Sequence, residues 1–145
     1  SLCFGGPYQI NSAKGGFLKW RRGVNLKRFI QVTEQTCIAL IKINTGYLAE
    51  FHNLHRLLRL CECFSEKPYH LFLSNAEDER LFGILLKSYS ATRYNDNFTV
   101  TKEDSEHLYK KVHTFLLLSV DMCNKKIEQL KIQADYHRQI ISEAQ

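Results

Sequence analysis

Apolar residues recur every three or four positions along most of this chain, the spacing that gathers them on one side of an α-helix. No run of alternating apolar and polar residues is long enough to indicate a β-strand, and only two prolines and seven glycines interrupt the pattern. The pattern therefore predicts an all-α protein, a four- or five-helix up-and-down bundle with a long C-terminal helix.

The glycines gather near the front of the chain. Residues 1–22 contain Gly5-Gly6-Pro7 and Gly15-Gly16, so we expect an irregular lead-in with a short helical piece at 17–22. The helical bundle should then occupy residues 23–145, because apolar residues fall on one helical stripe soon after Gly23.

Capping residues mark the expected ends of the helices. Gly46 is a candidate C-cap for the helix that follows Gly23, and Asn53 is a candidate N-cap for the next. Ser74-x-x-Glu77 has the spacing of a capping box, and Thr101-x-x-Asp104 is an acidic variant of the same motif. These signals predict helices that end near 46 and begin near 53, 75 and 101.

The last segment should be one long helix, because the chain contains no Gly or Pro from Thr101 onward. About 40 helical residues would span about 60 Å, which is longer than a small bundle needs, so residues 116–145 are expected to project. An apolar stripe continues along this segment in alternating steps of four and three residues: Leu116, Val120, Cys123, Ile127, Leu130, Ala134, His137 and Ile141. Such a stripe needs a partner helix, and self-association is its commonest outcome.

Charge is distributed unevenly along the chain. The net charge is +5, and no acidic residue precedes Glu34. The same region contains six basic residues: Lys14, Lys19, Arg21, Arg22, Lys27 and Arg28. This positive face could bind the phosphates of a nucleotide or RNA, or an acidic protein, but it could equally be a solvated helix end without a ligand.

The cysteines and histidines suggest neither disulfides nor a metal site. Five cysteines form an odd set, and Cys37 and Cys61 fall in apolar stripes, which fits reduced thiols in the cytoplasm. His52-x-x-His55 followed by Cys61-x-Cys63 is a weak zinc signal, because one intervening residue turns two helical thiols apart. No apolar stretch approaches the roughly 18 residues of a membrane span. We expect a cytoplasmic protein without a metal or cofactor.

Three segments, in this order and spacing, carry a family resemblance. They are Thr33-Glu34-Gln35 with Ala39-Leu40 and Thr45-Gly46-Tyr47; His52-Asn53-Leu54 with Leu57-Leu58; and Ala91-Thr92-Arg93-Tyr94 with Thr99-Val100-Thr101-Lys102-Glu103-Asp104. Over residues 23 to about 130 the chain resembles the HEPN domain, a small all-α nucleotide-binding module of higher eukaryotes and prokaryotes, in the bacterial branch that accompanies nucleotidyltransferases.

The resemblance implies a bundle that forms a homodimer about a two-fold axis, beside or fused to a nucleotidyltransferase. A chain that starts with Ser1 rather than Met is consistent with such a fusion. Glu34, Gln35, His52 and Asn53 would form a structural motif of the family. The chain departs from the family at its front, where glycines interrupt the first long helix, so we expect that helix to be shortened or lost.

Many HEPN proteins are metal-independent ribonucleases in which an Arg is followed, after four to six residues, by a His. A neutral imidazole can take the proton of a ribose 2′-hydroxyl, while a guanidinium holds the phosphate oxygens. Arg93 matches the first residue of the pair, but Phe98, Thr99 and Val100 stand where the His belongs. The nearest downstream histidine is His107.

We therefore expect a non-catalytic module that binds a nucleotide or RNA through Arg93, Tyr94, Asp96 and the basic face, and that pairs with a nucleotidyltransferase. In one alternative, Arg93 and Tyr94 only clamp the end of a helix. In a second, the chain is a toxin-like ribonuclease that uses Arg93 with a displaced His107. In a third, it is a helical assembly module that pairs through residues 116–141.

Overall fold

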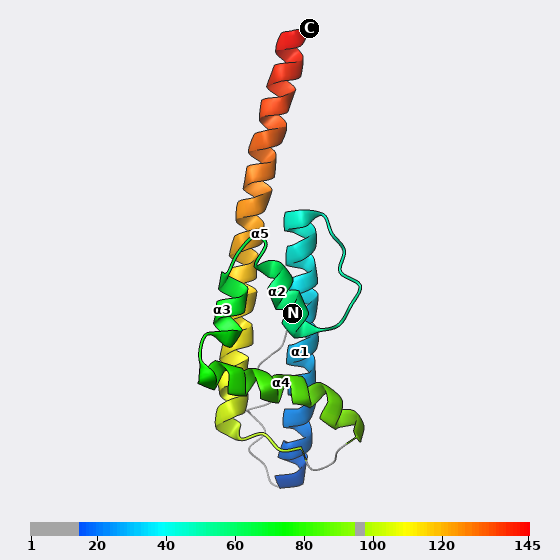
Figure 1. Ribbon diagram of the computed structural model, residues 1–145, viewed down its shortest axis with the longest axis vertical. Helices are drawn as coiled ribbons and strands as arrows, with labels where there is room; N and C mark the ends of the chain where they lie inside the picture. The colour runs from blue at the N-terminus through cyan, green and yellow to red at the C-terminus, as the bar shows by residue number, and fades with distance from the viewer. Residues whose placement is uncertain (1–14, 95–97) are drawn as a thin grey trace.

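The computed structural model describes residues 15–94 and 98–145, which form an all-α bundle without strands (Figure 1). The fold class predicted from the hydrophobic pattern is confirmed, including the long C-terminal helix. Five helices make up the described chain: α1 (Gly15–Thr45), α2 (Leu54–Cys61), α3 (Lys67–Leu73), α4 (Ala76–Tyr94) and α5 (Lys102–Ala144).

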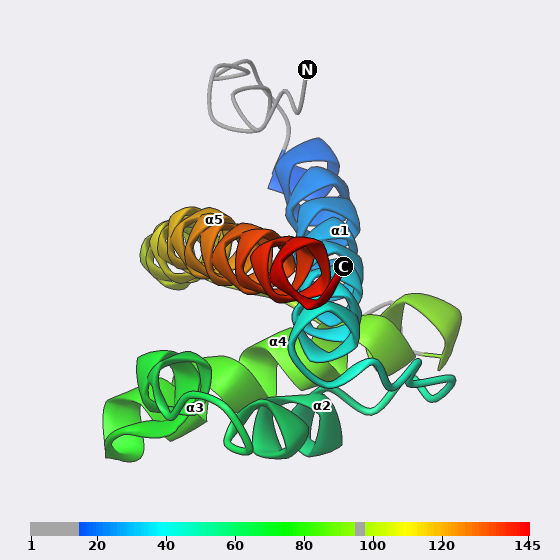
Figure 2. The same ribbon diagram turned by 90° about the horizontal axis from the view of Figure 1, so that it is seen from above.

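The two long helices, α1 and α5, lie side by side and run in the same direction (Figure 1). The shorter helices α2, α3 and α4 cover one side of this pair, and no other helix of residues 15–94 and 98–145 lies on the opposite side (Figure 2). Each helix contributes a fully buried residue to one common core: Leu40, Leu57, Phe72, Leu85 and Phe115 are at most 1% exposed. The rings of Phe72 and Phe115 meet edge to face with centroids 5.5 Å apart.

Helix α1 is longer than the glycines suggested. It has 31 residues and continues through Gly16 and Gly23, so the expected shortening at the front of the bundle is not seen. A glycine in a helix interior costs about 1 kcal/mol relative to alanine. Burial of Leu26 and Phe29, just beyond Gly23, offsets a penalty of that size. Residues 1–14 of the predicted lead-in lie outside the described part of the chain.

Three of the predicted caps are confirmed. Thr101 begins α5, because its Oγ1 accepts the N–H of Asp104 at 3.1 Å. Gly46 ends α1 with a positive φ of 77°, and its N–H donates to the carbonyl of Lys42 at 2.9 Å. Asn53 begins α2, because its side-chain Oδ1 accepts the N–H of Arg56 at 2.9 Å. The loop between Gly46 and Asn53 leads the chain from the end of α1 back to its side.

The capping box predicted at Ser74 and Glu77 is wrong by one residue. Asn75 caps α4 instead, with its Oδ1 accepting the N–H of Asp78 at 2.9 Å. Ser74 is the C-terminal cap of α3, and its hydroxyl donates to the carbonyl of His70. The connection between α3 and α4 is so short that adjacent residues end one helix and begin the other.

Helix α5 is anchored only along its first half. Its fully buried residues are Ser105, Leu108, Val112, Phe115 and Ser119, whereas all residues from Ile127 onward are exposed. The rest of the helix extends past the other four (Figure 1). The projecting part is shorter than the expected residues 116–145, because Ser119 is buried and Met122 and Cys123 still pack against the core. No helix within the described residues is long and apolar enough to cross a membrane.

Candidate interaction surface on helices α1 and α5

Arg93 and Tyr94, the expected phosphate-binding pair, are the last two residues of α4. Their side chains, and the whole of Asp96, lie outside the described part of the chain. Of the residues that stand where the resemblance would place a histidine, Thr99 is exposed and Val100 packs in the core with 8% exposure. Val100 therefore anchors the segment that leads into α5.

His107 lies near an ionic network at the start of α5. Arg80 of α4 donates two hydrogen bonds to the carboxylate of Asp104, at 3.0 and 2.7 Å, and two more to Glu77. Arg80 is the main reason that the pKa of Asp104 is lowered, and the charge of His107 adds a smaller effect. Because two carboxylates already hold the Arg80 guanidinium, this arginine does not replace Arg93 as a phosphate ligand.

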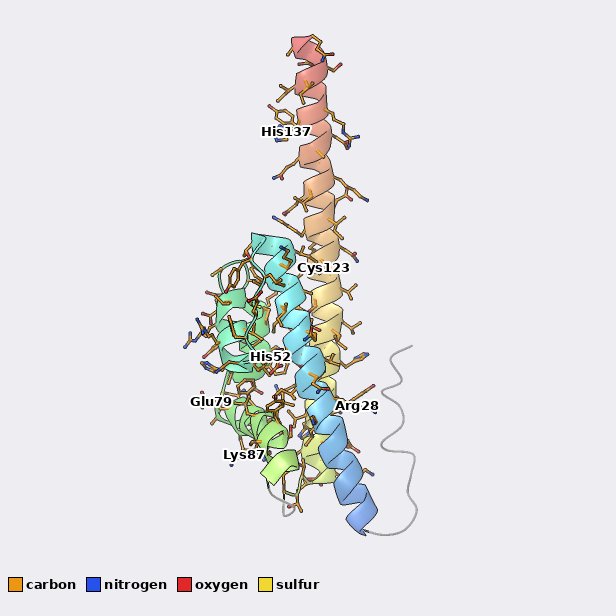
Figure 3. All side chains as sticks on the ribbon, turned by 90° about the vertical axis from the view of Figure 1, so that its right-hand side faces the viewer. Arg28, His52, Glu79, Lys87, Cys123 and His137 are labelled. Carbon is orange, nitrogen blue, oxygen red and sulfur yellow. The ribbon has the colours of Figure 1, made fainter. Side chains whose placement is uncertain are left out.

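Glu34 and His52, expected to be a structural pair, are in contact. The Nδ1 of His52 lies 3.4 Å from the Oε2 of Glu34, which joins α1 to the residue preceding the α2 cap (Figure 3). Glu34 is only 6% exposed, and this burial raises the pKa of its carboxyl while His52 acts in the opposite direction. Gln35 points elsewhere: it is exposed and lies beside α5.

The basic face is only partly described. Positions 21 and 22 lie within α1, but the side chains of Arg21 and Arg22 are outside the described part. Lys27 is half-buried and Arg28 is exposed on α1 (Figure 3). Among the described residues of this face, Arg28 is thus an exposed cation.

A groove lies between α1 and α5. It has a volume of about 630 Å³, and none of the residues that line it is charged. Helix α1 contributes Gln31, Val32, Gln35, Thr36, Ala39 and Leu40; helix α5 contributes Leu116, Ser119, Val120, Cys123 and Asn124. The sequence pattern did not indicate the α1 side, because glutamine, threonine and alanine leave no apolar periodicity.

The groove continues upward into the apolar stripe of α5. Leu116, Val120 and Cys123 belong to both, and Ile127 and Leu130 extend the stripe where α5 leaves the bundle. We call the whole stripe the α5 seam; it consists of Leu116, Val120, Cys123, Ile127, Leu130, Ala134, His137 and Ile141. Figure 3 shows Cys123 alongside α1 and His137 far beyond it.

Large apolar side chains of the α5 seam face solvent. Val120 is 59% exposed, Ile127 44%, Leu130 46% and Ile141 60%. Single exposed apolar residues are common, but a continuous row on one helix face is typical of a surface that binds another protein.

The described residues hold no group of three or more His, Cys, Asp and Glu side chains arranged for a metal. Cys61 is buried and Cys63 is exposed, so their thiols point apart as the spacing predicted. The pKa of Cys37 is raised, chiefly by a hydrogen bond with Cys61 and then by burial, so the Cys37 thiol is a poor nucleophile.

The chain was compared with protein-family models, with curated proteins and with solved structures, and no match was found in any of the three. Evidence for a function therefore comes from the α5 seam and the α1–α5 groove.

Proposed function

We propose that this chain is a non-catalytic helical interaction module, similar in design to HEPN domains, that binds another helix along the α5 seam. The continuity between the α1–α5 groove and the exposed stripe of α5 supports this proposal most directly. A groove alone could take a small molecule, and a stripe alone could be a solvated helix end. Together they form a continuous apolar surface that is long enough to bind a helix.

The α5 seam exposes apolar surface that its own bundle does not cover. Burying apolar surface stabilises an interface by about 25 cal/mol per Å², before the cost of association. Knobs-into-holes packing needs apolar residues every three and four positions on each helix, which is the spacing of the α5 seam.

The proposal can be tested with a designed peptide that forms an amphipathic helix with Ile and Leu at complementary positions and Gln at the flanking ones. Binding measured by fluorescence anisotropy should be lost in a variant carrying Ile127→Asp and Leu130→Asp. Ile132→Asp is the matched control, because Ile132 is equally apolar and exposed but lies on the opposite side of α5. Equal binding by both variants would refute a role for the α5 seam.

The resemblance to HEPN domains adds a nucleotidyltransferase as the expected partner, and a homodimer as the expected assembly. Pairing of two copies through their bundle faces would leave the projecting half of α5 available for a different protein. Sedimentation of a chain that ends at Lys125 distinguishes the two dimer modes. Its dimer persists if bundle faces pair, and it becomes a monomer if the projecting helix pairs.

The uneven charge of α1 favours a second candidate function, the binding of a nucleotide or RNA at its basic end. Acidic residues are absent before Glu34, and Arg28 is exposed on this helix. Reversing Arg21, Arg22, Lys27 and Arg28 to Glu should weaken RNA binding without unfolding the bundle, and the wild-type affinity should fall steeply with salt. Reversal of the exposed Lys110 of α5 is the control. An affinity unchanged by the fourfold variant would exclude this function.

A further inference from the structure

The charges that border the α5 seam are all positive. In heptad notation the seam places Val120, Ile127, Ala134 and Ile141 at a, and Leu116, Cys123, Leu130 and His137 at d. The e and g positions flank such a seam, and between 116 and 145 their charged residues are Lys126, Lys131 and Arg138. Neither Asp nor Glu occupies an e or g position in this range.

The carboxylates of this part of α5 lie away from the seam. Asp121, Glu128 and Asp135 recur every seven residues, at the b position. Two of them form pairs within the helix: Asp121 with Lys125 at 2.9 Å, and Asp135 with Arg138 at 2.6 Å. The positions that flank the seam thus carry only cations, of which Arg138 is already paired with Asp135, and a partner on the seam meets mainly basic residues.

A second copy of the chain is therefore a poor occupant of the α5 seam. In a parallel, in-register pair, the g residue of one helix faces the next e residue of the other, which sets Lys126 against Lys131 on both sides. In an antiparallel pair, e faces e and g faces g, so Lys and Arg again meet only cations or neutral residues. Like charges at these positions oppose pairing.

The apolar residues of the seam match a two-stranded arrangement. Among parallel coiled coils, β-branched residues at a combined with Leu at d favour two helices. The α5 seam has Val120, Ile127 and Ile141 at a, with Ala134 as the exception, and Leu116 and Leu130 at d, beside Cys123 and His137. One further helix beside α5 matches this preference.

We propose that the α5 seam binds one amphipathic helix of another protein whose flanking positions carry Asp or Glu. This inference rests on the proposed function and adds the chemistry of the partner. The partner's carboxylates would face Lys126, Lys131 and Arg138 along the projecting half. One end of the partner helix would cover the uncharged α1–α5 groove beside Ala39 and Cys123. Apolar packing gives the affinity, and the charges select the partner.

The test uses the full chain and three peptides with the same Ile and Leu positions, which differ only at e and g: Glu, Gln or Lys. The expected order of affinity is Glu, then Gln, then Lys, with a difference on the order of tenfold or more between the extremes at low salt. Salt should reduce this difference, because it screens exposed charges. A flank variant with Lys126→Glu, Lys131→Glu and Arg138→Glu should invert the order. Lys125→Glu, on the outer face, should leave it unchanged.

The outcomes separate this inference from the function on which it rests. If none of the peptides binds, the α5 seam is not a helix-binding surface and both proposals fail. If all three bind equally, the seam binds helices but charge does not select them, which overturns the inference alone. A second copy of the chain is the remaining possible occupant of the α5 seam. Sedimentation of the wild type and of the variant with Ile127→Asp and Leu130→Asp tests for it. Equal sedimentation supports the inference, whereas a wild-type dimer that the variant lacks would show a second copy on the seam and overturn it.

Discussion

At the scale of single residues, two carboxyl groups of the fold have pKa values shifted in opposite directions. Glu34 is buried beside His52, and desolvation raises its pKa. Asp104 receives two hydrogen bonds from Arg80, which lower its pKa. Each contact joins separate parts of the chain, so the stability of the bundle should depend on pH in two distinguishable ways.

Glu34→Gln should remove a pH-dependent cost of the wild-type fold. A carboxyl whose pKa is raised on folding favours the folded state below its ordinary value of 4.5, and this advantage is lost as pH rises through the raised pKa. The free energy of unfolding of the wild type, minus that of the variant, should therefore fall from about pH 4 to 7, as measured by urea titration. Glu79→Gln removes an exposed carboxylate as the control. A difference that stays constant across this range would contradict the assigned burial cost.

Asp104→Asn should show the opposite dependence. A carboxyl whose pKa is lowered on folding stabilises the fold above its ordinary value of 3.8, and this contribution is lost as pH falls through the lowered pKa. The variant should be less stable than the wild type at neutral pH, and the two should converge in acid. Thermal melts at several pH values test this, with Asp121→Asn as an exposed, ion-paired control. Equal melting of variant and wild type at neutral pH would mean that the Arg80–Asp104 contact does not stabilise the fold.

At the scale of elements, local residue chemistry predicted where most helices begin and end. The absence of Gly and Pro after Thr101 predicted α5, and Gly46 and Asn53 marked the ends that the structure shows. The start of α4 was misplaced because Ser74 and Asn75 are both good caps, and only the packing of α3 decides between them. The front of α1 was missed because burial outweighed the penalty of its glycines.

Substitution of two glycines by alanine should change the stability of the bundle in opposite directions. Gly46 has φ of +77°, which costs a residue with a Cβ about 1 kcal/mol, so Gly46→Ala should destabilise the bundle by about that amount. Gly83 lies inside helix α4, so Gly83→Ala should stabilise it by about 1 kcal/mol. An added Cβ meets nothing within 4 Å at either site, so contacts do not confuse the comparison. Urea titration measures both; a shift of the same sign in the two variants would contradict this account.

A chain that ends at Lys125 should fold like the complete one. The fully buried residues of α5 end at Ser119, so the truncation removes helix but little of the core. The thermal midpoint should shift by only a few degrees, since surface changes cost little stability, while helical circular dichroism falls with the lost residues. Loss of cooperative melting would instead show that the projecting half stabilises the bundle.

At the scale of the whole molecule, the arrangement of helices supplied what the sequence could not. The α5 seam was visible as a heptad pattern, but the groove beside it depends on α1 lying parallel to α5. Gln31, Gln35 and Ala39 carry no signal for this, because their role arises only from the neighbouring helix. The expected ligand site at Arg93, Tyr94 and Asp96 stays a prediction, because these side chains lie outside the described part of the chain.

The untruncated chain should leave RNA intact. Phe98, Thr99 and Val100 stand where the resemblance to HEPN ribonucleases would place a histidine, and Val100 is buried in the core. Labelled mixed-sequence RNA incubated with the protein and EDTA should therefore show no cleavage. Cleavage that disappears in both Arg93→Ala and His107→Ala would overturn this expectation and identify a ribonuclease with a rearranged pair.

The projecting half of α5 also bears on how long the protein survives. Beyond Lys126 this helix is held by contacts between its own turns, such as the pair of Asp135 and Arg138. An isolated helix of this length is only marginally stable in water, so its end should fray. Frayed ends are preferred sites of proteolysis, whereas a bound helix would protect them. A chain without its partner would then be trimmed, and the amount of intact protein in a cell would follow the supply of that partner.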